Sequence, residues 1–259
     1  MCLILFAFQA SADYPLVVAA NRDEAYTRPT AAAAFWSDHC QVYGGRDLEM
    51  GGTWMGMGLT LSGRFAAVTN FRDGPPKGNA PRSRGELVGG YLTGDTQAQT
   101  YLQMVAARQT EYAGFGVLAG NLQSLWFLSN YGHGVEAVAP GVHGLSNHLL
   151  NTPWPKVATG KSELAALLQN SAPSLMEKCF DMLADRSVAT DHELPDTGVG
   201  LQREKALGAK FIAVDDRYGT RASTVIIVRR DGKVTYAERS FGAHGKFLGE
   251  VTRDFQLTA

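Results

Sequence analysis

Cys2 is the residue of this chain best suited to chemistry, because it directly follows the initiator methionine. Methionine aminopeptidases generally remove Met1 when the second side chain is small, which would leave a thiol and a free α-amine on one residue. The ordinary pKa is about 7.7–8.0 for such an amine and about 8.5 for a thiol, so the amine can accept the thiol proton near neutral pH. The pair would supply a nucleophile and its general base for attack on an amide or thioester carbonyl. The alternative is a small buried cysteine at the start of a core strand.

Short segments of distinctive sequence recur along the rest of the chain. They are Asn21-Arg22-Asp23-Glu24 with Arg28-Pro29 after it, Gly51-Gly52-Thr53-Trp54, Thr69-Asn70, Arg82-Ser83-Arg84-Gly85, His143-Gly144-Leu145-Ser146-Asn147 and Tyr218-Gly219-Thr220-Arg221-Ala222-Ser223-Thr224. In this order, after a Met-Cys start and a short apolar hairpin, the set resembles the NRDE family, also called transport and Golgi organisation 2-like proteins. Each segment alone is weak evidence, whereas their joint occurrence over nearly the whole chain is specific.

The resemblance implies an α+β fold of the N-terminal-nucleophile (Ntn) hydrolase type. This fold is a four-layer αββα sandwich, in which two packed, mainly antiparallel sheets are flanked by helices. The closest catalytic relatives would be the cysteine-dependent penicillin and bile-salt amidases. We expect residues 1–259 to form one such domain, since no internal repeat, low-complexity tract or convincing boundary divides the sequence.

The same resemblance assigns roles to three residues near the start of the chain. Cys2 matches the nucleophile, and Arg22 and Asp23 resemble the arginine and aspartate that sit beside it and hold its amine. The two are separated by a couple of residues in the amidases and adjacent here, which leaves open which side chain faces the site. A carboxylate at Asp23 would orient the amine and also raise its pKa, and a nearby guanidinium would lower the thiol pKa. A charged turn with its own salt bridges is the competing interpretation.

Three residues farther along the chain complete the implied site. Asn70 resembles the oxyanion-hole asparagine, Asn147 a second asparagine that positions the site, and Arg221 an arginine near the thiol. An N–H donated to a developing oxyanion typically lowers the barrier by about 3 kcal/mol. Asparagines also bond backbone groups in turns, so structural roles for both amides stay open.

Two functions are compatible with this pattern. The first is a cysteine Ntn hydrolase that cleaves an amide or thioester bond of a small acylated substrate, with Cys2 as nucleophile and its α-amine as base, and that requires no cofactor. The second, implied by the family resemblance, is a non-catalytic protein that binds and moves haem, acyl-CoA or lipid in the same pocket. A basic loop with Lys77, Arg82 and Arg84 is either an anion contact at the pocket mouth or a solvated turn.

Apolar patterning indicates the elements that must position these residues. We expect strands at 2–9, 15–20, 51–58, 64–71, 114–119, 123–129, 222–229 and 233–239, and helices at 84–92, 95–109, 161–170 and 172–186. The first two strands should form a hairpin buried on both faces, because they are almost continuously apolar. Asp231-Gly232 predicts a tight turn between the last two strands, and the polar stretch 187–203 predicts an exposed loop.

The composition limits the kinds of partner and the cellular compartment that we expect for this protein. The 24 basic and 25 acidic side chains nearly balance, which argues against a broad electrostatic surface for nucleic acid or anionic membranes. No apolar run approaches the length of about 20 residues that spans a bilayer, and Asp13 and Pro15 interrupt the apolar start too soon for a secretory signal. Three cysteines without a CxxC pair predict a cytoplasmic protein without disulfides. The spacing of His143 and His148 argues against a zinc site.

Overall fold

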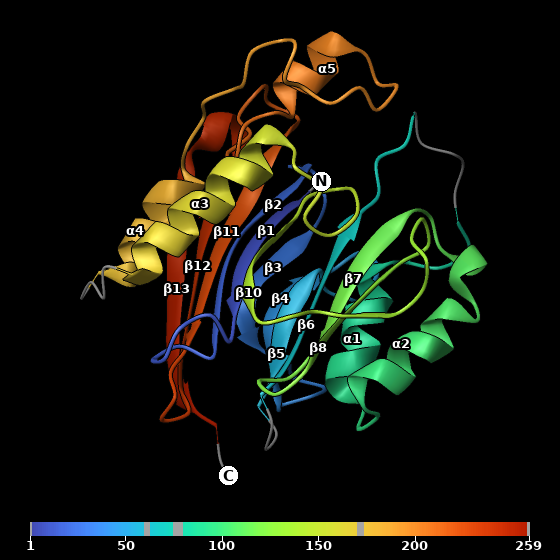
Figure 1. Ribbon diagram of the computed structural model, residues 1–259, viewed down its shortest axis with the longest axis vertical. Helices are drawn as coiled ribbons and strands as arrows, with labels where there is room; N and C mark the ends of the chain where they lie inside the picture. Colours follow the sequence, from blue (N-terminus) through green and yellow to red (C-terminus); the bar gives the residue numbers. More distant parts are fainter. Residues whose placement is uncertain (1, 60–62, 75–79, 170–173, 258–259) are drawn as a thin grey trace.

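Two antiparallel sheets face each other, with a large hydrophobic core between them (Figure 1). The computed structural model describes residues 2–59, 63–74, 80–169 and 174–257. The first sheet has the order β10-β1-β2-β11-β12-β13, built in that order from Gly141–Leu145, Cys2–Phe8, Leu16–Ala25, Tyr218–Val228, Lys233–Phe241 and Phe247–Gln256. The second has the order β3-β4-β5-β6-β7-β8-β9, built from Thr30–Phe35, Val42–Asp47, Met55–Gly58, Arg64–Asn70, Phe115–Gly120, Leu125–Ser129 and Glu136–Ala137.

Helices cover the outer face of each sheet. α3 (Pro155–Gln169) and α4 (Leu175–Leu183) pack on β1, β2, β10 and β11 of the first sheet. α1 (Gly85–Thr93) and α2 (Ala98–Ala106) pack on β5 to β8 of the second. A short helix, α5 (Leu201–Ala206), lies beyond the end of the first sheet, at the top of Figure 1. The chain is therefore a mixed α+β protein in which the layers run helix, sheet, sheet, helix.

Alternation along β1 and β2 explains why their sequences are apolar almost throughout. Successive side chains of a strand point to opposite faces, so Ile4 and Phe6 reach into the core between the sheets, whereas Leu3 and Leu5 pack against the helices. Every residue of β1 is buried, and β1 pairs antiparallel with β2 along its whole length. The predicted hairpin, buried on both faces, is confirmed.

β2 is longer than predicted, which changes the setting of residues 21–24. The strand continues to Ala25 because it pairs with β1 on one side and with β11 on the other. The prediction that these residues follow the second strand is therefore wrong, and so is the charged turn that it allowed. Asn21 and Arg22 pair with both β1 and β11, whereas Asp23 and Glu24 pair with β11 alone. Asn21, Arg22 and Asp23 are buried.

The other predicted elements occur with shifted ends. The remaining predicted strands correspond to β5 to β8, β11 and β12, and Gly232 (φ 82°) lies in the predicted turn. α1 and α2 match the first two predicted helices, while α3 begins at Pro155 instead of residue 161, because proline fits the first turn of a helix. The predicted helical residues 170, 172 and 173 lie outside the described residues. The predicted loop 187–203 ends in α5.

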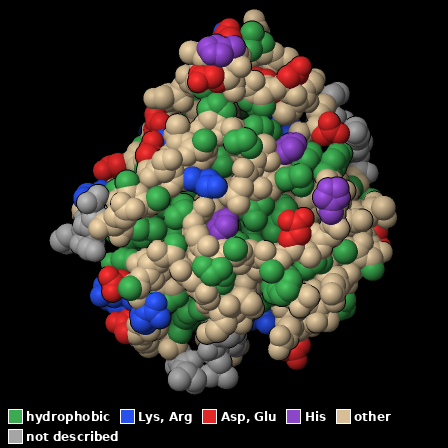
Figure 2. All heavy atoms as spheres, in the orientation of Figure 1, with side chains coloured by type: hydrophobic (Ala, Val, Ile, Leu, Met, Phe, Trp, Pro, Cys, Tyr) green, Lys and Arg blue, Asp and Glu red, His purple; other side chains and the backbone are tan. Residues whose placement is uncertain are grey.

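Charged side chains are spread over the face of the molecule that Figure 2 shows. On the face shown in Figure 2, acidic and basic side chains lie singly or in mixed groups among apolar and neutral ones. Within the described ranges, no helix is both long enough and apolar enough to cross a bilayer. The described side chains on this face therefore present no broad surface of one charge sign.

Candidate active site

The segments singled out in the sequence meet at one end of the two facing sheets. In the first sheet, β10 and β11 contain most of segments 143–147 and 218–224, and they flank the hairpin that holds Cys2 and segment 21–24. In the second sheet, Asn70 ends β6. Segments 51–54 and 82–85 touch through their glycines, since a Cβ on Gly52 would lie 2.5 Å from the carbonyl carbon of Gly85.

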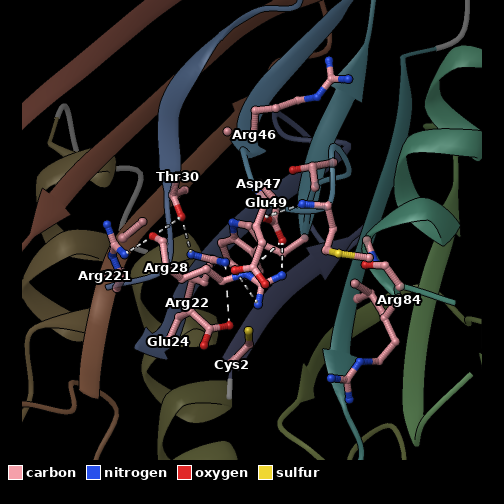
Figure 3. A pocket seen from close by; sticks show the side chains of 18 of the residues that line it. Cys2, Arg22, Glu24, Arg28, Thr30, Arg46, Asp47, Glu49, Arg84 and Arg221 are labelled. Carbon is pink, nitrogen blue, oxygen red and sulfur yellow. Dashed lines mark hydrogen bonds and ion pairs between the residues drawn. The ribbon is translucent and has the colours of Figure 1, made fainter. Parts of the chain in front are cut away.

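A cavity of about 670 Å³ opens between the sheets at this end (Figure 3). That volume suits a small organic ligand. Figure 3 shows the Cys2 sulfur beside Arg22 and Glu24, with Arg84 on the opposite side. The charged residues that line the cavity are Arg22, Asp23, Glu24, Arg28, Arg46, Asp47, Glu49, Arg82, Arg84, Arg221 and Glu238. Of the predicted site residues, Cys2, Arg22, Asp23, Asn70 and Arg221 line the cavity, and Asn147 is outside its lining.

Cys2 is held at the start of β1 from several directions. It pairs in register with Arg22 of β2, and its carbonyl accepts the Ser146 hydroxyl at 3.1 Å. The residue is 7% exposed. Burial raises the pKa of the thiol, against the effect of a hydrogen bond with the backbone of Asp23. The thiol is therefore protonated at neutral pH, and a nucleophilic role requires a base that removes this proton.

Arg22 and Asp23 point to opposite faces of β2, which resolves the question left open by their adjacency. Arg22 faces the cavity, where Nη1 donates to Thr30 Oγ1 at 3.3 Å and Nη2 lies 3.8 Å from Glu24 Oε2. The Asp23 side chain points to the opposite face of the strand, where its Oδ1 accepts the Thr220 hydroxyl at 2.7 Å, although the residue also borders the cavity. Burial raises the pKa of the Asp23 carboxyl, while nearby positive charges and the Thr220 bond oppose the rise.

A buried lysine that the sequence does not predict as a site residue lies near Asp23. Lys156, in the first turn of α3, is 6% exposed, and its Nζ donates to the Leu207 carbonyl at 2.9 Å. Burial lowers its pKa to about 8, although the negative charges of Asp23 and the Cys2 thiolate favour its charged form. In the sequence Lys156 lies outside the predicted helices, so only its contacts in the folded chain distinguish it.

Asn70 and Asn147 contact each other. Asn147 Nδ2 donates to the Asn70 carbonyl at 3.0 Å, and the Asn147 carbonyl accepts the Arg72 N–H at 2.8 Å. Asn147 is buried and has a left-handed φ of 55°, a conformation that asparagine adopts more readily than most residues. Asn147 therefore fixes the end of β6, from which Asn70 lines the cavity.

Arg221 lies in a β-bulge, where the register between β11 and β2 shifts by one residue. A bulge re-aims the side chain of the extra residue. Its Nη1 donates to three backbone carbonyls at the end of β2 and in the segment that follows it, those of Ala25, Tyr26 and Arg28, at 3.1, 3.0 and 2.6 Å. Arg221 thus lines the cavity and also anchors the segment that delivers Arg28 to it.

The arginines at the cavity mouth differ in their partners. Three of them are held by carboxylates: Arg28 by Asp47 and Glu49, Arg46 by Asp38, and Arg82 by Glu86 and Glu111. Arg84 instead donates Nη1 to the Gly114 carbonyl at 3.1 Å, and burial lowers its pKa. Lys77, the third residue of the predicted basic loop, lies outside the described residues. Arg84 thus presents a cation bonded to a neutral group.

Comparison with known proteins identifies the family of this chain. The family model described as Transport and Golgi organisation 2 matches residues 1–243. The chain belongs to this family. Curated relatives include the Bos taurus Transport and Golgi organization protein 2 homolog, 36% identical over 99% of both chains, and the Homo sapiens homolog, 36% identical over 93% of each. The Drosophila melanogaster Transport and Golgi organization protein 2 is 29% identical over 99% of both chains.

The predicted resemblance to transport and Golgi organisation 2-like proteins is confirmed at this level. The names of the relatives refer to transport and Golgi organisation and state no reaction, so the chemistry of this Transport and Golgi organisation 2 family member has to be argued from its site. Two supporting side chains, Ser146 and Thr220, lie inside the segments that mark the family. Lys156 lies outside them, and no sequence signal distinguishes it.

Cys2 is the cysteine of this family member that faces the cavity. All three cysteines carry free thiols; Cys40 is exposed, and Cys179 is buried between α4 and the first sheet. Among the residues that the structure describes, no three His, Cys, Asp or Glu side chains gather so that they could hold a metal ion. His143 and His148 bond to neutral neighbours in the chain. Of the three thiols, that of Cys2 therefore borders the cavity.

Proposed function

We propose that this protein is a cysteine hydrolase of the N-terminal-nucleophile type, acting on the amide or thioester bond of a small acylated substrate. The observation that carries the proposal is the placement of Cys2. The residue after the initiator methionine lies on the wall of a ligand-sized cavity, paired with Arg22 and next to Asp23. The layer order supports the Ntn type, since helices cover the outer faces of two antiparallel sheets and the site lies between the sheets.

Removal of Met1 would free the α-amine of Cys2 for general-base catalysis. The amine takes the thiol proton while the sulfur bonds to the substrate carbonyl carbon and the π electrons move to oxygen. The tetrahedral intermediate then breaks its C–N or C–S bond, and the α-ammonium returns its proton to the leaving group. Water attacks the resulting thioester with the same amine as base, which releases the acid and restores the thiol.

The charges around the cavity suit the proposed steps. The raised pKa of the buried thiol makes a base necessary, and the Arg22 guanidinium faces the cavity, where it favours the thiolate. Asn70 lines the cavity at the end of β6. Its amide is the candidate donor to the oxyanion, an interaction that typically lowers the barrier by about 3 kcal/mol.

The first test is the intact mass of the purified protein, before and after treatment with iodoacetamide, with mapping of the label. We expect the mass to lack Met1 and the label to appear on Cys2 at least about tenfold faster than on exposed Cys40, because an adjacent base increases thiolate reactivity. Cys179, which is buried in the helix layer, serves as the unreactive internal control. Retained Met1, or a Cys2 no more reactive than Cys40, would contradict the α-amine mechanism.

One observation favours a second function, binding of a hydrophobic anion such as haem or acyl-CoA without turnover. Arg84 is half-buried and donates a hydrogen bond to a neutral carbonyl, and burial lowers its pKa although the charges of Cys2 and Glu24 oppose this effect. An anionic ligand group would complete its bonding. Apolar side chains from Trp54, Val68 and Phe241 line the same cavity and would contact the rest of such a ligand.

Arg84→Gln should weaken such binding by about tenfold or more, because hydrogen bonds to charged groups contribute about 1.5–3 kcal/mol. Arg46→Gln is the matched control, since Arg46 lines the same cavity but is already paired with Asp38. The measurement is a fluorescence titration with haem and, separately, with oleoyl-CoA. Cys2→Ala should leave both affinities unchanged. Equal losses in the two arginine variants, or an affinity that depends on the Cys2 thiol, would contradict this second function.

A further inference from the structure

We infer that Lys156 sets the protonation state of the Cys2 α-amine, so that the amine can act as a base at neutral pH. The inference rests on the proposed function, because it concerns the base of that mechanism. A carboxylate beside an amine favours the ammonium form, and an ammonium has no lone pair with which to accept the thiol proton. Without a compensating positive charge, Asp23 would therefore disable the base that it orients.

Lys156 is placed to supply that charge. α3 packs on β1 and β10, and Lys156 is buried in its first turn. The hydrogen bond of its Nζ goes to the Leu207 carbonyl, a neutral group that leaves the charge of the ammonium uncancelled. Asp23 of β2 is close enough for the two charges to act on each other. The α-amine of Cys2 would begin β1 next to this pair.

The other charged groups that face Lys156 leave this balance unchanged. They come from three elements: Cys2 at the start of β1, Arg72 just after β6 and Glu204 in α5. Arg72 and Glu204 form a buried ion pair, with Nη2 2.8 Å from Oε2, so their effects on Lys156 oppose each other. Asp23 is then left facing the positive charge of Lys156 and, more weakly, that of Arg22. These positive charges oppose the increase that Asp23 alone would cause in the pKa of the amine, so more of the amine is neutral and able to act as a base.

The same arrangement favours the state that follows proton transfer. Once the amine has taken the thiol proton, the new ammonium lies next to the Asp23 carboxylate. The thiolate is then stabilised by the positive charges of Lys156 and Arg22, as each of these charges acts on Cys2. Opposite charges within a few ångströms favour the ionised forms of both groups. Lys156 is therefore a positioning residue for the base, since its charge acts through Asp23 and makes no contact with substrate.

The α-amine can be titrated without the thiol, in a Cys2→Ala chain from which Met1 is removed because alanine is small. We expect Lys156→Met in this background to slow acylation of the amine by acetic anhydride about tenfold at neutral pH, since a tenfold loss of neutral amine corresponds to one pKa unit. Lys156→Arg keeps the charge and should retain the parent pH profile. Lys210→Met is the control, a second buried lysine that instead bonds to Glu163 and Asp185.

Two results would overturn the inference: identical amine titrations in Lys156→Met and its parent, or an equal shift in Lys210→Met. Thermal unfolding of each variant verifies the fold, and Lys156→Gln takes the place of Lys156→Met if the methionine chain does not fold. The proposed function fails separately, on the unmodified chain, if Cys2 shows no selective reactivity. The amine titration then still decides the role of Lys156.

Discussion

Replacing Cys2 with alanine should lower acyl transfer by at least about a thousandfold, because removing a catalytic nucleophile leaves only background reaction. The fold should be kept, because alanine differs from cysteine only in lacking the sulfur atom and therefore fits the same space. The measurement is single-turnover release of p-nitrophenol from p-nitrophenyl acetate, with mass spectrometry of the protein. The parent chain should gain one acetyl group on Cys2, and the alanine chain should gain none in the cavity.

Two further variants separate Cys2 from general thiol reactivity. Cys40→Ala removes an exposed thiol and should lower the slow background without changing the fast phase. Cys2→Ser keeps a small polar side chain but replaces the thiol with a far weaker acid, so it should also lose the fast phase. A fast phase that survives Cys2→Ala, or that disappears with Cys40→Ala, would exclude Cys2 as the nucleophile.

The parts of the fold that the sequence predicts are those with strong apolar patterning. β1, β2, β11 and β12 are long, apolar and joined as hairpins, and they occur where expected. β3 (TAAAAF) and β4 (VYGGRD) are not predicted, because alanine and glycine are poor strand formers and these segments depend on pairing with their neighbours. β13 at the sheet edge is largely exposed and lacks a clear apolar face. These strands therefore form because they pair with neighbouring strands of the sheet, which the local sequence does not reveal.

The sequence likewise predicts which residues form the candidate site, whereas tertiary contacts determine how their side chains are oriented. The family segments predict that Cys2, Arg22, Asp23 and Asn70 come together, and the structure brings them to one end of the sheets. The direction of Arg22 and Asp23 depends on how far β2 extends, which its pairing with β11 determines. The β-bulge at Arg221 also results from the pairing of β11 with β2. Lys156 approaches Asp23 through packing of α3 on the first sheet, a contact between residues far apart in sequence.

Extending the chain before Cys2 should slow acylation about 10²–10⁴-fold, the usual contribution of a general base. An extension turns the α-amine into an amide, which has no basic lone pair, and leaves the thiol in place. The clearest form of the test is a cleavable N-terminal extension whose removal makes Cys2 the first residue. The same protein sample is then assayed with p-nitrophenyl acetate before and after cleavage. A chain with one added glycine is the matched control for steric blocking by the longer extension.

The pH dependence separates loss of the base from blocking of the cavity. In the glycine-extended chain the thiolate must form without help, and burial raises the pKa of this thiol above its ordinary value. Its acylation rate should therefore increase with pH throughout the range below that raised pKa. In the mature chain the rate should level off once the amine is neutral, near its ordinary pKa of about 7.7–8.0. Rates within about threefold of each other at neutral pH, with parallel profiles, would show that the α-amine is not the base.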